Sequence, residues 1–166
     1  MTIGVSGPIA PARKRSATGR ALLTGTVAGT WTSGLVLAGY GTASIAAGGS
    51  VDPWPELGAN ALRMLAIAAM FTVPAAVAVF FILFSATAEQ RVRQRVRVFA
   101  AVGGAIGLIL GALFLQWVFA LVGLVAGAAG AAVGLLAAVR APRSWFIVGV
   151  AVLVTIAAVV QGFRVP

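Results

Sequence analysis

Apolar and polar stretches alternate along the whole chain. Four apolar stretches cover approximately residues 21–48, 61–88, 98–139 and 145–163, and short polar segments separate them. A helix rises about 1.5 Å per residue, so about 20 apolar residues cross a hydrocarbon core of about 30 Å. Each of the four stretches is long enough for this. The pattern therefore predicts an all-α, polytopic integral membrane protein.

The third stretch, residues 98–139, is too long for one crossing. It carries no charged residue, and as a single helix it would measure about 63 Å, twice the hydrocarbon thickness. We divide it into spans 98–116 and 119–139, with a turn near Trp117. This division predicts five transmembrane helices in one domain, residues 21–163. A single crossing would leave four spans and stays open as the alternative.

The basic residues predict the orientation. With five spans, Arg63 and Arg164 lie on one side of the membrane and the other ten of the 12 Lys and Arg residues on the opposite side. Because Lys and Arg accumulate in short cytoplasmic segments, we expect a cytoplasmic N-terminus. Residues 1–20 would then be a basic, flexible cytoplasmic tail.

Composition supports a membrane location and argues against catalysis. Hydrophobic residues make up 61% of the chain and charged residues 9%, whereas soluble domains are typically about 25% charged. The chain has no His or Cys, which are the usual residues for acid–base catalysis and metal ligation. We expect no enzyme, no cofactor and no metal site. Arginine far exceeds lysine, which indicates a bacterial source and hence a multi-pass protein of the inner membrane.

A run of alternating arginines, EQRVRQRVRVF, precedes the third stretch. Arg91, Arg93, Arg95 and Arg97 flank a narrow apolar stripe if this run is helical. We expect mainly a topology signal, a short segment at the inner membrane surface that fixes the orientation of the chain. Its arginines could also bind anionic lipids or an acidic partner. Nucleic-acid binding is not expected, because no aromatic residues interleave with the arginines.

Glycines recur at helical spacing in the two spans that follow. Small residues on one helix face allow close backbone contact within a bilayer. The two spans could pair with each other, or one glycine face could pair with a second copy or another membrane subunit. The residues concerned are Gly103, Gly107, Gly111, Gly123, Gly127, Gly130 and Gly134.

Hydroxyl side chains mark one face of the first span. At about 100° per residue they project within roughly 40° of one direction. Such a face could line a hydrated path or cradle a polar ligand, or its hydroxyls could simply bond neighbouring backbone. The residues are Thr26, Thr30, Ser33, Tyr40 and Ser44.

Arg63 could form an ion pair at the outer end of the second span, with Glu56 or with Asp52. Arg63 lies about one turn into the second span, whereas Glu56 lies in the segment before it. The structural role of such a pair would be to hold this segment against the bundle.

These features favour a non-catalytic accessory subunit of a larger membrane complex. The alternative is a small transporter or pore, alone or as a homo-oligomer. Its working parts would be the hydroxyl face, a kink at Pro74 and the glycine faces. The chain has no acidic residue within a span for proton or sodium coupling, so a passive or lipid-like substrate would suit it.

Overall fold

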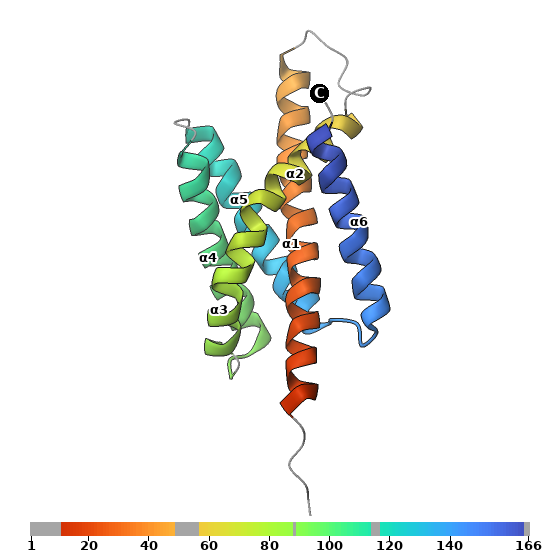
Figure 1. Cartoon of the computed structure of the whole chain (residues 1–166). Helices are drawn as coiled ribbons and strands as arrows, with labels where there is room; N and C mark the ends of the chain where they lie inside the picture. Colours follow the sequence, from red (N-terminus) through yellow and green to blue (C-terminus); the bar gives the residue numbers. More distant parts are fainter. Residues whose placement is uncertain (1–10, 49–56, 88, 114–116, 165–166) are drawn as a thin grey trace, which may run out of the picture.

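The chain forms a bundle of helices (Figure 1). A computed structural model describes residues 11–48, 57–87, 89–113 and 117–164, without the side chains of residues 11–17, 80, 81 and 85. The regular secondary structure of this described part is entirely helical. It comprises α1 (Pro11–Ala47), α2 (Leu57–Ala75), the π-helix η1 (Ala76–Phe80), α3 (Phe81–Ala86), α4 (Val92–Ala112), α5 (Trp117–Val139) and α6 (Trp145–Arg164).

Five helices are long and apolar enough to span a membrane: α1, α2 with its continuation η1, α4, α5 and α6. The predicted all-α membrane bundle with five spans is confirmed. The long uncharged stretch divides as expected, because α4 ends at Ala112 and α5 begins at Trp117.

The second span changes helix type after Pro74. Proline has no N–H for the carbonyl four residues earlier, which interrupts the α-helical ladder, and local π-type turns can satisfy the freed groups. The π-helix η1 begins two residues after Pro74, and α3 then continues the span to Ala86.

Four of the five spanning helices begin earlier than the sequence pattern indicated, and α1 and α4 do so by six residues or more. α1 begins at Pro11, so residues 11–20, expected in a flexible tail, extend this helix to 37 residues. α4 begins at Val92. The arginine run is therefore not a separate segment along the membrane surface, because most of it forms the first turns of a spanning helix.

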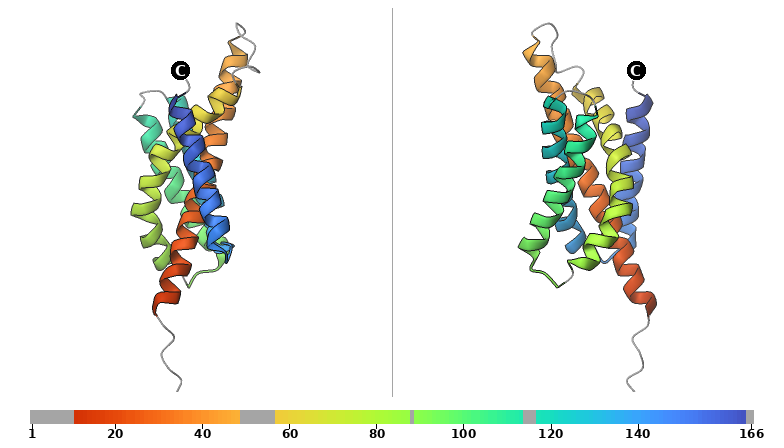
Figure 2. Two further views of the ribbon diagram at one scale, coloured as in Figure 1. Left: turned by 45° about the vertical axis from the view of Figure 1, so that its right-hand side comes forward. Right: turned by 90° about the vertical axis from the view of Figure 1, so that its left-hand side faces the viewer.

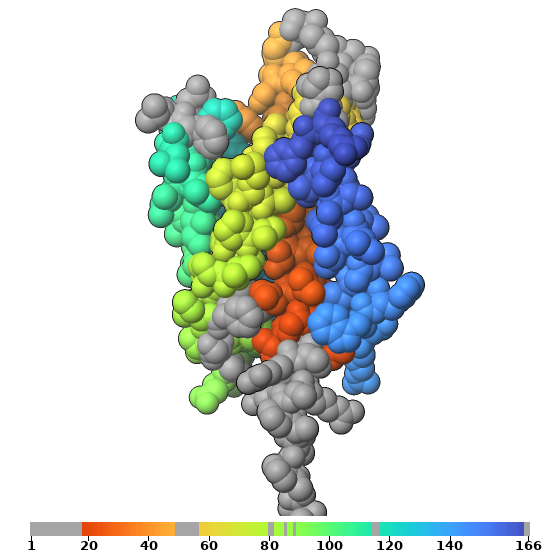
Figure 3. All heavy atoms as spheres, in the orientation of Figure 1, coloured from red at the N-terminus to blue at the C-terminus, as the bar shows by residue number. Residues whose placement is uncertain are grey.

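α1 is the central helix of the bundle (Figures 1 and 2). It packs against α5, α2 and α6, whereas α4 packs mainly on α5 and α6 mainly on α2. In the space-filling view, α2, η1 and α3 form the face between α4 and α6 (Figure 3). We refer to α2, η1 and α3 together as the α2–α3 segment.

The charged residues gather at one end of the bundle. Successive spans alternate in direction, so the starts of α1, α4 and α6 lie at the same end as the ends of α3 and α5 (Figure 1). We call this the arginine-rich end; Arg63 and Arg164 lie at the opposite end. Its described arginines are Arg20, Arg91, Arg93, Arg95, Arg97, Arg140 and Arg143.

Glycines bring α4 and α5 into backbone contact. A Cβ added at Gly107 would collide with the carbonyl oxygen of Gly123, and one added at Gly127 with that of Gly103. Contact this close requires glycine on both helices. The glycines on this interface are Gly103, Gly107, Gly111, Gly123 and Gly127.

Further along the same face of α5, two more glycines pack on α1. A Cβ at Gly134 would lie 2.8 Å from the carbonyl oxygen of Gly25, and one at Gly130 would lie 3.0 Å from that of Gly29. All seven glycines singled out in the sequence thus face helices of the same chain. α6 is held similarly, because a Cβ at Gly162 would collide with the carbonyl of Leu62 in α2.

We predict that Gly107→Ala destabilises the bundle by about 1–3 kcal/mol, the usual cost of overpacking a tight contact. The matched control is Gly149→Ala on α6, where an added Cβ meets nothing within 4 Å. Alanine there should be neutral or stabilising by up to about 1 kcal/mol, because it favours helix over glycine. Unfolding in detergent micelles, followed by circular dichroism, measures both changes. Equal stability of the two variants would contradict the packing described.

Candidate functional site

A partly open cavity of about 440 Å³ lies between α1, the α2–α3 segment, α4 and α5. Its origin is the uneven packing of the helices. α5 is joined closely to both α4 and α1, and the α2–α3 segment is joined to α1, whereas α4 and the α2–α3 segment make little contact with each other. The cavity is the space that remains between α4 and the α2–α3 segment.

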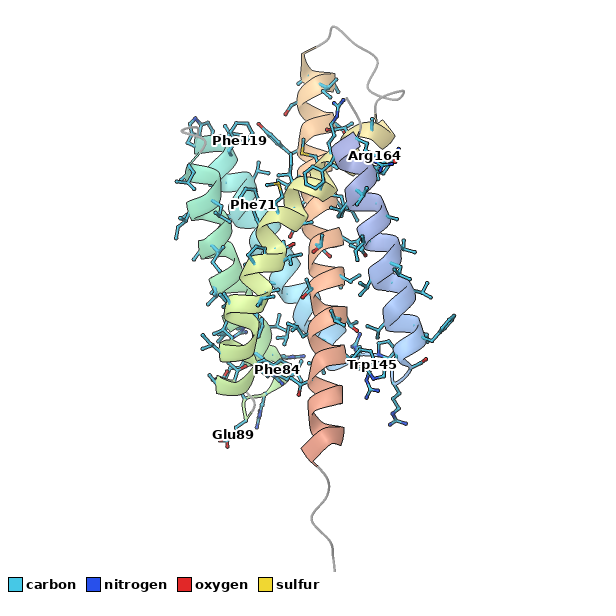
Figure 4. The ribbon with its side chains drawn as sticks, viewed as in Figure 1. Phe71, Phe84, Glu89, Phe119, Trp145 and Arg164 are labelled. Carbon is cyan, nitrogen blue, oxygen red and sulfur yellow. The ribbon has the colours of Figure 1, made fainter. Side chains whose placement is uncertain are left out.

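The cavity runs along most of the bundle. Its lining on α1 extends from Gly25 to Ser44, which is about 29 Å of helix and close to the hydrocarbon thickness of a bilayer. Leu83 lines it towards the arginine-rich end, and Phe71 and Phe119 line it towards the other end (Figure 4).

The hydroxyl face of α1 turns towards this cavity. Thr26, Ser33, Tyr40 and Ser44 line it, and Thr30 lies just behind the lining, 1% exposed. The structure therefore brings four of the five predicted residues to one wall of one cavity.

Most of these hydroxyls are engaged within the protein. Thr26 and Ser44 each donate to the carbonyl four residues earlier, both at 2.9 Å. Ser33 donates to the carbonyl of Ala126 in α5 at 3.0 Å. The Thr30 hydroxyl bonds that of Thr72 in α2 at 2.8 Å.

Tyr40 lies near the end of the cavity that is far from the arginine-rich end. Its ring meets that of Phe119 edge to face, with the centroids 6.1 Å apart. Edge-to-face pairs of this kind are favourable beyond the area they bury. The pair links α1 to the start of α5 and forms part of the cavity lining.

The cavity is therefore suited to hydrocarbon rather than to water. Buried water needs two to four polar partners, and an apolar cavity of about 150 Å³ stays dry and admits a benzene-sized molecule. This cavity is about three times larger. Its hydroxyls lie on α1 and at Thr72, and the remaining lining consists of glycine, alanine, aliphatic, methionine and phenylalanine side chains.

The wall formed by the α2–α3 segment carries small side chains at its middle. Ala68, Thr72, Ala75 and Ala76 line the cavity there, around Pro74 and the start of η1. π-Helical turns are rare and frequent at functional sites. Here the turn coincides with the cavity wall.

Arg95 lies beyond the cavity at the arginine-rich end. Its Nε donates to the hydroxyl of Thr87 at 3.3 Å, and its guanidinium lies over the ring of Phe84, 4.5 Å from the centroid. Its Nη2 is buried, with no hydrogen-bond partner among the described residues. Arg91, Arg93 and Arg97 are exposed. The four arginines, grouped together in the sequence, thus occupy two different environments.

A separate contact joins α1 to the start of α6. Arg20 donates to the carbonyl of Arg143 at 2.9 Å, and its guanidinium lies 5.7 Å from the Trp145 ring centroid. The predicted pair of Arg63 with Glu56 lies partly outside the described residues, because Glu56 belongs to the range 49–56. Arg63 itself is half-buried.

Sequence reasoning missed several polar contacts between helices. Thr72 partners Thr30, Thr87 holds Arg95, and the Trp31 indole donates to Thr155 at 3.0 Å, joining α1 to α6. The available signal was a single polar residue within an otherwise apolar span. That signal gives no partner, because the partner lies on another helix.

Comparisons with protein-family models, curated proteins and solved structures give no match to this chain. Among the described residues, no group of three or more His, Cys, Asp or Glu side chains could hold a metal ion. The cavity and the residues around it are therefore the features that bear on function.

We predict that Thr30→Val destabilises the bundle by about 0.6–1.7 kcal/mol, the range for interhelical hydrogen bonds in membranes. Thr72→Val should have a similar effect, because each leaves the other hydroxyl without its partner. The double variant should be less destabilised than the sum of the two, since paired apolar groups of the same shape are nearly neutral. Unfolding in micelles gives this double-mutant cycle. Strictly additive effects would show that the two hydroxyls do not interact.

Proposed function

We propose that this chain is a small, non-catalytic membrane protein that binds a lipid-like molecule between its helices and carries it passively across the membrane. The observation that carries the proposal is the interhelical cavity. It is about as long as a bilayer is thick, and its lining suits a long hydrocarbon chain.

The positions of the acidic residues favour passive movement of the lipid-like molecule. Glu89 is the single acidic residue of the described part, and it lies between α3 and α4, not within a span. Proton or sodium coupling usually requires an ionisable group inside the membrane. A carrier without such a group moves its substrate down a concentration gradient.

The orientation is part of the proposal. We place the N-terminus and the arginine-rich end on the cytoplasmic side of a bacterial inner membrane, where Lys and Arg accumulate in short loops. In that orientation the exposed Arg91, Arg93 and Arg97 face anionic lipid headgroups, which attract basic side chains near the membrane surface. The opposite end, with Phe119 and Arg164, faces outwards.

An accessory subunit of a larger complex is the second candidate. The weak attachment of α6 favours it. This helix packs mainly on α2, near Gly162, and Phe146 and Leu153 on its other faces are 79% and 67% exposed. Such a face suits a neighbouring subunit as well as lipid. Native mass spectrometry after gentle extraction would support this role by showing a larger protein at fixed stoichiometry.

We predict that Ala75→Phe slows lipid movement, because the ring would occupy the narrow middle of the cavity. The control is Ala78→Phe, which adds the same ring to the same segment at an exposed position outside the cavity lining. Purified protein in sealed vesicles, with a phospholipid that carries a fluorescent acyl chain and dithionite outside, reports exchange between leaflets. Ala75→Phe should lower the rate about tenfold or more, as a barrier higher by about 1.4 kcal/mol would.

Ala78→Phe should exchange lipid at the unmodified rate. Equal rates for the two variants would overturn the role of the cavity. So would a wild-type protein that exchanges lipid no faster than empty vesicles.

A further inference from the structure

The cavity ends close to the half-buried side chain of Arg95, whose Nη2 atom is buried. Phe99 lines the cavity near the arginine-rich end, and Arg95 lies one turn before it on the same face of α4. On the facing wall, Leu83 lines the cavity and Thr87 lies one turn beyond it. Arg95 and Thr87 are bonded to each other. Together they close the gap between α4 and the α2–α3 segment just beyond the last apolar lining residues.

Arg95 has unused hydrogen-bonding capacity. A guanidinium presents five donors, and here Nε is engaged with Thr87 whereas the buried Nη2 has no partner in the described part of the chain. Glu89 is exposed, and no ion pair joins it to Arg95. A buried charged donor without a partner is costly. An anionic oxygen at this point would remove that cost.

The surroundings of Arg95 also favour an anion. Arg91, Arg93 and Arg97 lie on the same two turns of α4 and are exposed. Their charges add to a positive potential, which the single described acidic side chain, the exposed Glu89, offsets only in part. The Phe84 ring covers one face of the Arg95 guanidinium. Nη2, at the edge of the guanidinium, has no hydrogen-bond partner in the described part of the chain, so an oxygen ligand of Arg95 would bind there.

We propose that the molecule bound in the cavity is an acidic amphiphile with one long hydrocarbon chain, whose phosphate or carboxylate headgroup is bound by Arg95. This assignment rests on the proposed function, because it takes the cavity to hold the hydrocarbon chain. A guanidinium recognises phosphate and carboxylate through the same paired N–H donors. Arg95 then provides selectivity for acidic over neutral lipids, and the cavity provides the apolar contact.

The test compares probes that share a chain but differ in charge. The purified full-length protein in a non-ionic detergent is titrated with oleoyl lysophosphatidic acid, with oleate and with oleoyl lysophosphatidylcholine, which carries no net charge. Binding is measured by native mass spectrometry and by calorimetry, at low salt and at about 0.5 M salt, where exposed charges are largely screened.

The variants are Arg95→Met and the control Arg93→Met, which removes the same charge from an exposed position two residues earlier. Arg95→Met should weaken binding of an acidic probe about tenfold or more, even in high salt, and leave the neutral probe unchanged. Arg93→Met should change acidic binding less than twofold in high salt. The acidic probe that responds, phosphate or carboxylate, identifies the headgroup.

Equal effects of Arg95→Met and Arg93→Met on the acidic probes would overturn the headgroup site. If Arg95→Met also loses the neutral probe, its fold is altered, and Arg95→Gln, which retains a donor towards Thr87, carries the same expectation. A different result is expected if the hydrocarbon chain does not bind in the cavity. In that case all three probes would bind equally well to Ala75→Phe and to Ala78→Phe.

Discussion

Close backbone contact at glycine is the interaction on which the rest of this structure depends. In a bilayer, apolar side chains gain little by leaving lipid, so helices associate through packing at small residues and through interhelical hydrogen bonds. α5 carries its glycines on one face, with Gly123 and Gly127 against α4 and Gly130 and Gly134 against α1. α4 and α1 therefore contact the same side of α5 at different heights along it. These contacts leave α4 apart from the α2–α3 segment, and the cavity is the result.

The polar residues join neighbouring helices and leave most of the cavity lining apolar. Ser33 joins α1 to α5 and Thr30 joins α1 to α2, so these hydroxyls hold the walls of the cavity together. The cavity keeps an apolar lining over nearly the depth of a bilayer, with the half-buried Arg95 just beyond one end. A hydrocarbon chain with an acidic group at one end matches both features. Hydration would leave most of the lining without a favourable contact.

Much of the fold could be predicted from the sequence, because length and hydropathy alone define five spans. The division of residues 98–139 followed from the thickness of a bilayer, and the hydroxyl face of α1 followed from helical periodicity. What could not be predicted is which faces meet. The glycines of α5 offered no sign that Gly123 and Gly130 serve different partners. Arg95 could not be separated from Arg93, since the positions of Phe84 and Thr87, which lie outside α4, distinguish their surroundings.

The most direct test of the account is whether the cavity holds hydrocarbon or water. The chain contains no cysteine, so single cysteines can be placed at Ala76 in the cavity wall, at exposed Ala78 on the same segment and at exposed Arg93. Each variant in lipid vesicles is treated with a charged, water-soluble thiol reagent. The account predicts that the cysteine at position 93 reacts rapidly and that those at 76 and 78 remain unmodified. Reaction at position 76 as fast as at position 93 would show a water-filled path and contradict it.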